Sequence, residues 1–157
     1  MSTGDPFQVR ERTWQYSLPA EFGHEDITRD VQQLVSDSGV VTGALTVGTV
    51  GSTGAVTTIE YESGAMEDLR LALEGVAPAS GEYQHNLRWG DGNGFSHVRS
   101  ALLKTGLSIP VVEGRLALGT WQQLVVLNLD NRARRREVVG IVMGRQEQDR
   151  NGGAAVR

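Results

Sequence analysis

The order of strand-like and helix-like segments constrains the fold of this chain more than any other feature. Residues 9–18 alternate as a strand does, helical spacing runs from Ile27 to Gly39, and strand-like segments follow at 40–50 and 55–61. Two more helical and three more strand-like segments come next, without regular alternation of strand and helix. This order is typical of an α+β fold and not of a doubly wound parallel sheet. We therefore predict a single α+β domain with about three short helices.

The later segments surround a polar, glycine-rich stretch. A second helix is expected from Ser63, with Gly75 as its stop, and a third helix over residues 95–104. Between them, Tyr83 and His85 are expected to share one face of a short extended piece, because strand side chains two apart point the same way. Residues 116–129 are expected to form one long strand interrupted at Gly119.

Composition narrows the function classes. The chain has 157 residues, which favours one domain, and it has no cysteine, which excludes a disulfide scaffold, a thiolate metal site and cysteine nucleophile chemistry. A net charge of −4 gives no global reason to bind nucleic acid. No apolar stretch approaches the roughly 20 residues that span a bilayer, and the N-terminus lacks the features of a signal peptide. We expect a cytoplasmic protein without nucleic-acid or membrane partners.

Two of the three histidines flank the glycine-rich stretch. His85 and His97 enclose a turn that contains Asp91 and Asn93, and His97 falls in the first turn of the predicted third helix, where free N–H groups attract anions. Two imidazoles are too few for a firm zinc site, which normally has three protein ligands and water in catalysis. A third ligand would have to come from His24, Asp91, Glu60 or Glu62. The alternative is that both histidines are ordinary polar residues satisfied by hydrogen bonds.

Other candidate groups each have a structural alternative. Glu60 and Glu62 are predicted to lie on one face at the end of a strand, where they could act as bases or as oxygen ligands. The alternative is that they are solvated acids that precede a helix. Trp121 could stack on the ring of a ligand while Gln122 forms hydrogen bonds to the edge of that ring. The alternative is that Trp121 is a core residue at a bulge. The arginine run at 132–136 suits phosphate, or forms a solvated turn.

These motifs occur together in one order that resembles a known family. Its elements are Tyr83-x-His85, Asp91-Gly92-Asn93, His97 before a helix, Pro110-Val111, Gly114-Arg115-Leu116 and Leu118-Gly119-Thr120-Trp121-Gln122. The arrangement resembles the YjbQ-like family, described as secondary thiamine-phosphate synthase-type proteins. The similarity runs from Asp26 to Gly144, so we expect a YjbQ-like domain over residues 1–144 and a disordered polar tail over 145–157.

The resemblance implies a curved, mostly antiparallel sheet that forms a half-barrel, a homotrimer, and a pocket with three histidines that hold a divalent metal, zinc or magnesium. It also implies weak thiamine-phosphate synthase-type transferase activity on a phosphorylated small molecule. By position it assigns catalytic roles to His85, His97, Asp91 and Glu60, with both histidines as metal ligands. Ligand-binding roles fall to Asn93, Arg115, Thr120, Trp121, Gln122 and Ser52.

The chain departs from the family pattern at the first histidine. Ser52 stands at that position, and a hydroxyl is a far poorer ligand than imidazole for zinc-like metals. The acid that follows is shifted by one residue, to Glu60 or Glu62, and Asp130-Asn131-Arg132-Ala133-Arg134 replaces a family Asp-Gly-Pro-Arg. Two hypotheses follow. One is a YjbQ-like enzyme with a histidine pocket for a phosphorylated small molecule. The other is a catalytically degraded homologue that acts as a binding or structural trimer without a competent metal centre.

Overall fold

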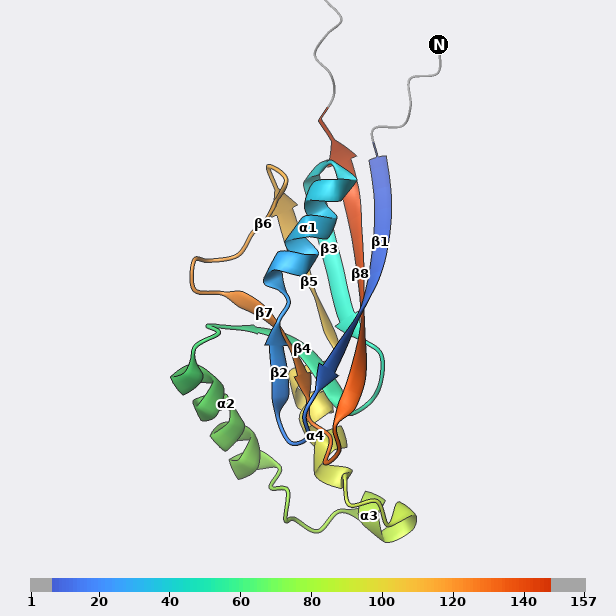
Figure 1. The fold of residues 1–157 in the computed structure, drawn as a ribbon, viewed down its shortest axis with the longest axis vertical. Coiled ribbons are helices and arrows are strands. Elements are labelled where there is room, and N and C mark those ends of the chain that lie inside the picture. Colours follow the sequence, from blue (N-terminus) through green and yellow to red (C-terminus); the bar gives the residue numbers. More distant parts are fainter. Residues whose placement is uncertain (1–6, 148–157) are drawn as a thin grey trace, which may run out of the picture.

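The computed structural model describes residues 7–147, and within them two antiparallel sheets carry the fold (Figure 1). The larger sheet has the order β1-β8-β3-β5-β6 and the smaller one β2-β7-β4. The strands are β1 Phe7–Leu18, β2 Gly23–Asp26, β3 Val40–Thr49, β4 Gly54–Ile59, β5 Gly106–Val112, β6 Arg115–Leu116, β7 Gln123–Asn128 and β8 Arg134–Gln146. The helices are α1 Thr28–Ser38, α2 Ser63–Val76, α3 Gln84–Trp89 and α4 Gly94–Leu103.

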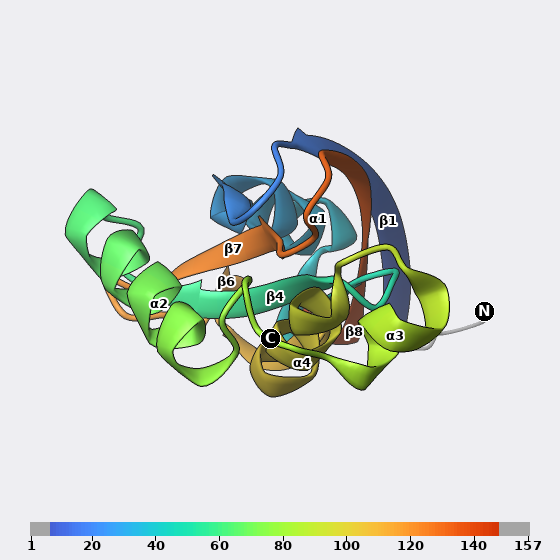
Figure 2. The same cartoon turned by 90° about the horizontal axis from the view of Figure 1, so that it is seen from below.

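The larger sheet curls around α1. Its two longest strands, β1 and β8, pair from Phe7 opposite Arg145 to Leu18 opposite Arg134, and Figure 2 shows both curving about α1 like part of a barrel wall. The apolar face of α1, formed by Val31, Leu34 and Val35, is buried in the core on the concave side of this sheet. The prediction of a single α+β domain with a curved antiparallel sheet is confirmed.

The strand β7 is covered on both faces, which explains its unbroken apolar run. Alternate side chains of a strand point to opposite faces. Accordingly, Leu124 and Val126 belong to the core around α1, while Val125 and Leu127 belong to a second core beside α2. The smaller sheet therefore separates two apolar layers.

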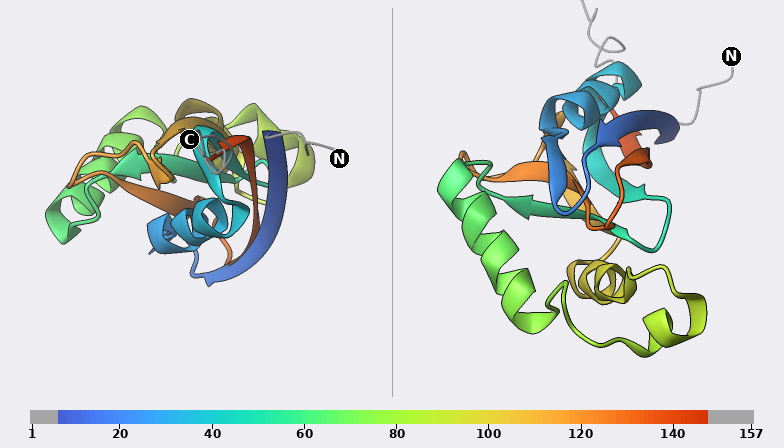
Figure 3. Two further views of the ribbon diagram at one scale, coloured as in Figure 1. Left: turned by 90° about the horizontal axis from the view of Figure 1, so that it is seen from above. Right: turned by 60° about the horizontal axis from the view of Figure 1, so that its bottom comes forward.

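The helices α2 and α4 lie on the outer side of the smaller sheet (Figures 2 and 3). From α2, Met66 and Leu73 are buried in the second core, and Leu103 of α4 packs against it. The short α3 follows α2 and contacts α4 at the end of the molecule opposite to where β1 begins and β8 ends. Of the helices in residues 7–147, none is long and apolar enough to cross a membrane.

The prediction of one long strand over residues 116–129 is wrong. This segment contributes to two strands, which lie in different sheets. Leu116 pairs with Val111 in the larger sheet, whereas β7 lies in the smaller one. A tight turn separates them, in which Gln122 N–H donates to Gly119 O at 3.0 Å and Gly119 N–H donates to Gln122 Oε1 at 3.1 Å. The side chain of Gln122 thus closes the turn that precedes β7.

The sequence pattern also failed at short or polar segments. His85, predicted on an extended piece with Tyr83, lies in the helix α3, whose N-cap is Tyr83, so there are four helices in residues 7–147 instead of about three. The four-residue β2 was not predicted, because three of its residues are polar. Gly75 lies inside α2, which continues to Val76. The expected tail starts too early, since β8 extends through residues 145–146, and the remainder at 148–157 lies outside the described residues.

Candidate functional site

His85 and His97 lie in contact. His85 is the second residue of α3, and His97 is, as predicted, in the first turn of α4. Their ring centroids are 4.4 Å apart with an interplanar angle of 40°. The turn between the two helices brings them together through Gly90 and Gly92, which have φ angles of +68° and +70° that side chains rarely adopt.

Asp91 completes a cluster with the two histidines. Its Oδ1 is 3.3 Å from His85 Nδ1, within ion-pair reach, although this contact does not have hydrogen-bond geometry. The amide of Asn93, oriented with its NH2 toward Asp91, donates to Oδ1 at 3.1 Å and to Oδ2 at 3.2 Å. The Asp91 carbonyl accepts from Asn131 Nδ2 at 2.9 Å, which ties this turn to the β7–β8 turn. Asn93 therefore holds the carboxylate of Asp91, and Asn131 holds its backbone.

The start of α4 is closely packed. Gly94 N–H donates to Asn86 Oδ1 of α3 at 2.9 Å, and a Cβ added at Gly94 would lie 2.5 Å from Tyr83 Cβ, so only glycine fits. The N-cap Asn93 makes no side-chain capping bond. Ser96, in the same first turn, is fully buried, and its Oγ has no hydrogen-bond partner within residues 7–147.

Ser52 and Glu60 lie at opposite ends of β4. Ser52 is exposed in the β3–β4 turn, and the next residue, Thr53, donates to Asp130 Oδ2 at 3.0 Å. Because Asn131 bonds to Asp91, this turn is linked to the histidine cluster. Glu60 is exposed beyond the other end of β4, roughly 20 Å away for a strand of this length. The structure thus brings Ser52, but not Glu60, toward the histidines.

Glu62 serves the helix that follows it. It is the N-cap of α2, and its carboxylate accepts from Gly64 N–H at 2.7 Å and from Ala65 N–H at 3.0 Å. These backbone hydrogen bonds hold the pKa of the Glu62 carboxyl below its usual value. The alternative of an acid at a helix N-terminus describes Glu62 better than a role as a metal ligand.

The Arg115, Thr120, Trp121 and Gln122 group lies apart from the histidines. Thr120, Trp121 and Gln122 belong to the β6–β7 connection, which the views in Figures 1 and 2 place on the other side of the chain from α3. The Trp121 side chain is 71% exposed and is not part of the core. Thr120 and Gln122 line a cavity of about 430 Å³ with Arg29 and Leu118. Within one chain, these residues are therefore separate from the histidine cluster.

The arginine run is only partly solvated. Arg132, Arg134 and Arg135 are exposed, but Arg136 is buried. Its NH2 donates to Thr53 O at 2.8 Å and to Asn128 Oδ1 at 2.6 Å. Arg136 therefore joins the β3–β4 turn to the end of β7. The sequence pattern missed this role because consecutive arginines look alike until a strand turns one of them inward.

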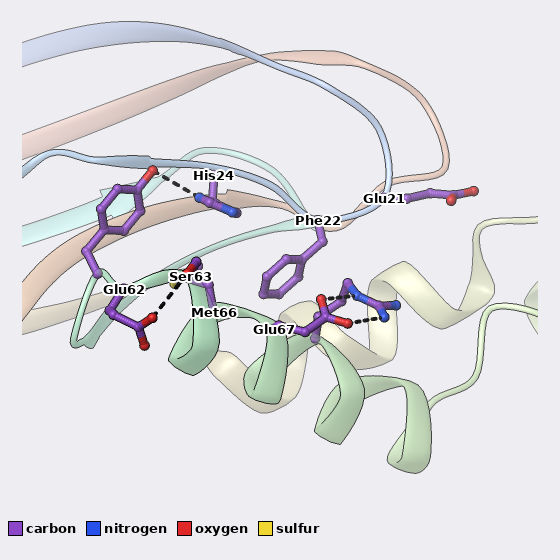
Figure 4. A pocket seen from close by; sticks show the side chains of 9 residues that line it. Glu21, Phe22, His24, Glu62, Ser63, Met66 and Glu67 are labelled. Atoms are coloured by element: carbon purple, nitrogen blue, oxygen red, sulfur yellow. Dashed lines mark hydrogen bonds and ion pairs between the residues drawn. The ribbon is translucent and has the colours of Figure 1, made fainter.

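The donor set does not complete a metal centre. In the part of the chain that the structure describes, no group of three or more His, Asp or Glu side chains is placed to hold a metal ion. His24, a predicted third ligand, lies on β2, where its Nδ1 is 3.0 Å from the Tyr61 hydroxyl. It lines a separate pocket with Phe22 and Tyr61 (Figure 4). Sequence reasoning missed this pocket, since no pattern joins these residues.

Comparison with known proteins identifies a family and relatives that are similar in sequence to this chain. A family model described as UPF0047 protein YjbQ-like matches residues 12–145. A UPF0047 protein of Methanothermobacter thermautotrophicus is 37% identical over 116 residues, which are 74% of this chain and 80% of the relative. A UPF0047 protein of Archaeoglobus fulgidus is 34% identical over 114 residues, which are 73% of this chain and 86% of the relative.

Solved structures agree. A YbjQ-like protein of unknown function from Sulfolobus solfataricus P2 has a TM-score of 0.83 and 30% sequence identity, over 88% of this chain and 99% of that one. A hypothetical protein from Aeropyrum pernix K1 has a TM-score of 0.74 and 32% identity, over 85% of this chain and 98% of that one. The resemblance expected from the histidine and Gly-Thr-Trp-Gln motifs is confirmed: the chain belongs to the UPF0047 family of YjbQ-like proteins.

Proposed function

We propose that the cluster of Asp91, His85 and His97 binds a phosphorylated small molecule and exchanges protons with it. The observation that carries this proposal is the contact between the two imidazoles, 4.4 Å apart between centroids, beside the Asp91 carboxylate. Histidine changes charge near neutral pH, so one ring of such a pair can hold a proton while the other accepts one. A protonated ring attracts phosphate, and a neutral ring serves as a general base.

The position of the cluster supports an anionic ligand. His97 lies in the first turn of α4, where the helix dipole and the backbone N–H groups favour negative charge. The N-cap Asn93 turns its amide to Asp91 and does not cap these groups. Because Gly94 N–H already donates to Asn86 Oδ1, a phosphate placed beside His97 would meet the helix dipole and an imidazole.

The activity proposed is thiamine-phosphate synthase-type transfer, which the family resemblance suggested. This reaction couples a pyrimidine diphosphate to a thiazole phosphate, and pyrophosphate leaves. Negative charge grows on the leaving group, and a protonated histidine beside it stabilises that charge. Asp91 fits the role of a positioning residue for His85, because its carboxylate lies 3.3 Å from Nδ1.

The divalent metal that the resemblance implied, zinc or magnesium, does not fit this donor set. When bound in a site of this kind, such an ion offsets charge on phosphate oxygens. Here the donors are two imidazoles, Ser52 stands at the position of a third, and Asp91 faces His85 Nδ1. We therefore assign no step to a metal.

The same departure favours a second candidate function. A family member without its first histidine can keep the anion site and lose turnover. In that case the protein is a binding or structural homologue, as a trimer, and it holds a phosphorylated ligand without converting it.

Titration with inorganic pyrophosphate, together with a turnover assay on the two thiamine precursors, tests both candidates. We expect His97→Asn to weaken pyrophosphate binding about tenfold, the value of one charge-assisted contact. Asp91→Asn should lower turnover at least tenfold, and Asp68→Asn, the same change on an exposed part of α2, should alter neither. Binding without turnover would support the second candidate. Unchanged binding in His97→Asn would overturn the proposed site.

A further inference from the structure

The pocket between β2 and α2 is a second site, independent of the histidine cluster (Figure 4). It has a volume of about 450 Å³, within the range of small-molecule sites. Three aromatic rings, those of Phe22, His24 and Tyr61, line one side, and Met66 of α2 lines the other. We propose that this pocket binds an organic ammonium cation, held against the aromatic rings.

The three rings form a continuous wall. Phe22 and His24 have centroids 5.6 Å apart at 71°, and His24 and Tyr61 have centroids 5.4 Å apart at 83°. Edge-to-face packing of this kind is favourable, and while Phe22 is buried, Tyr61 is 38% exposed and offers its ring to the pocket. The Nδ1–hydroxyl contact between His24 and Tyr61, at 3.0 Å, fixes the orientation of both rings. A ring face attracts a cation through its quadrupole.

The backbone at Phe22 adopts a strained conformation that places its ring in this wall. Glu21 and Phe22 have φ angles of +53° and +84°, which are unusual for residues with side chains. Hydrogen bonds keep them there: Glu21 N–H donates to Asp130 O at 2.8 Å, and Phe22 N–H donates to Asn128 O at 2.9 Å. Strain maintained in this way is often found at ligand sites. Here it directs the Phe22 ring toward α2, as Figure 4 shows.

The charges around the aromatic end are negative. Glu62, which caps α2, lines the pocket, and Asp26, which accepts from Thr28 and lines the neighbouring cavity, lies two residues beyond His24 on β2. Burial, with the charges of Glu25 and Asp26, raises the pKa of the Tyr61 phenol. Burial also lowers the pKa of the His24 imidazole, and this effect outweighs the charge of Glu25, which raises it. His24 therefore adds no positive charge at neutral pH. This surrounding favours a cationic ligand.

The one arginine of the pocket is already engaged. Arg70 donates to both carboxylate oxygens of Glu67, at 2.8 and 2.6 Å, so its charge is offset within α2. A phosphate or carboxylate ligand would therefore meet the Glu62 carboxylate without a free cation among the lining residues that the structure describes. This distinguishes the pocket from the histidine cluster, for which we propose an anionic ligand.

Three probes that share a phenyl ring and differ in charge test the assignment. These are benzyltrimethylammonium, benzyl alcohol and phenylacetate, titrated against the full chain while the His24 and Tyr61 ring signals are followed by NMR. We expect the cation to bind about fivefold more tightly than the alcohol, as one cation–π contact predicts, and phenylacetate to bind most weakly. Phenylacetate binding as tightly as the cation, or no shift of either ring with any probe, would overturn the proposal.

Two substitutions of Tyr61 separate ring electrostatics from contact area. Tyr61→Phe keeps the ring and should retain cation affinity within about twofold, whereas Tyr61→Leu should lower it about fivefold and leave benzyl alcohol nearly unchanged. Trp89→Leu, which removes an exposed ring of α3 outside the pocket, is the matched control and should change neither affinity. Circular dichroism checks that each variant is folded. An equal loss for the cation and the alcohol in Tyr61→Leu would show that the ring supplies only contact area, which contradicts the proposal.

Discussion

At the scale of single residues, Asp130 shows how buried charge fixes the turns around the histidine cluster. Its side chain is 1% exposed, and Oδ2 accepts from Thr53 at 3.0 Å and from Arg134 at 3.0 Å. Burial by itself raises the pKa of the Asp130 carboxyl, but these hydrogen bonds and the charges of Arg134 and Arg136 outweigh it and hold the pKa below the usual value. The carboxylate therefore stabilises the folded state in its charged form.

This pKa shift predicts a pH dependence of stability. A carboxyl with a lowered folded pKa contributes stability that is complete above its unfolded pKa of about 3.9 and is lost as pH falls through the folded pKa. We expect Asp130→Asn to be about 2 kcal/mol less stable at pH 7, and this difference to begin to close only below about pH 4, as the folded carboxyl takes up its proton. Urea denaturation at several pH values measures this. A constant gap down to pH 2 would contradict the role of the charge, and Asp68→Asn serves as control.

Ser52 carries a second prediction at this scale. If it occupies the position of the missing ligand, the unmodified chain should bind zinc weakly, and Ser52→His should tighten zinc binding about tenfold or more, because a third imidazole joins two that are already in contact. Calorimetric titration of both proteins measures the difference. Ser36→His, on an exposed position of α1, controls for the added imidazole. Tight zinc binding by the unmodified chain would show that another residue completes the site.

At the scale of elements, helix ends decide how α1 and α2 meet their loops. Gly39 ends α1 in the left-handed region with a φ of +71°, as its place in the sequence predicted. Gly75 lies inside α2, and a Cβ added there meets nothing within 4 Å. Glycine therefore has opposite effects at the two positions: its positive φ is needed just after α1, whereas in the last turn of α2 it only weakens the helix.

This contrast predicts opposite effects of alanine. Gly75→Ala should raise the free energy of unfolding by about 0.5–1 kcal/mol, because alanine loses less backbone entropy in a helix. Gly39→Ala should lower it by about 1 kcal/mol, through the positive φ and a Cβ only 2.9 Å from Gln146 Nε2. Thermal denaturation of the two variants compares them directly. A loss of stability in Gly75→Ala would mean that this glycine does end the helix.

At the scale of the whole molecule, the larger sheet has a long edge strand, β1, that no other strand of the described chain covers on its outer side. β1 is an edge strand of 12 residues, and Val9 on it is 57% exposed. Long edge strands offer backbone groups to other chains, and proteins usually cover or break them. An association of subunits would protect this edge.

We therefore predict a homotrimer, the assembly that the family resemblance implied. Light scattering at micromolar concentration should give about three times the 17.0 kDa mass of the chain. Val9→Asp, which places charge on the exposed edge, should weaken the assembly if β1 lies in the interface, and Asp68→Asn should not. A monomer at this concentration would refute the prediction.

The sequence by itself determined what depends on local periodicity and on family motifs. The α+β class, the helix that ends at Gly39 and the start of α4 near His97 were predicted from residue spacing, and the family was predicted from the resemblance of its motifs. These features follow from side chains three to four or two apart, and from glycine at turns, and both are visible in a linear chain.

Tertiary structure decided what depends on packing between distant segments. Only the fold shows that residues 116–129 divide between two sheets, that Arg136 is buried while Arg135 is exposed, and that the β6–β7 connection lies apart from α3. The fold also brings Phe22 of the β1–β2 turn to α2, which lies about 40 residues later in the chain. The pocket between them corresponds to no sequence motif. The physical reason is that burial and the directions of strands are set by long-range contacts, whose partners are not encoded in local spacing.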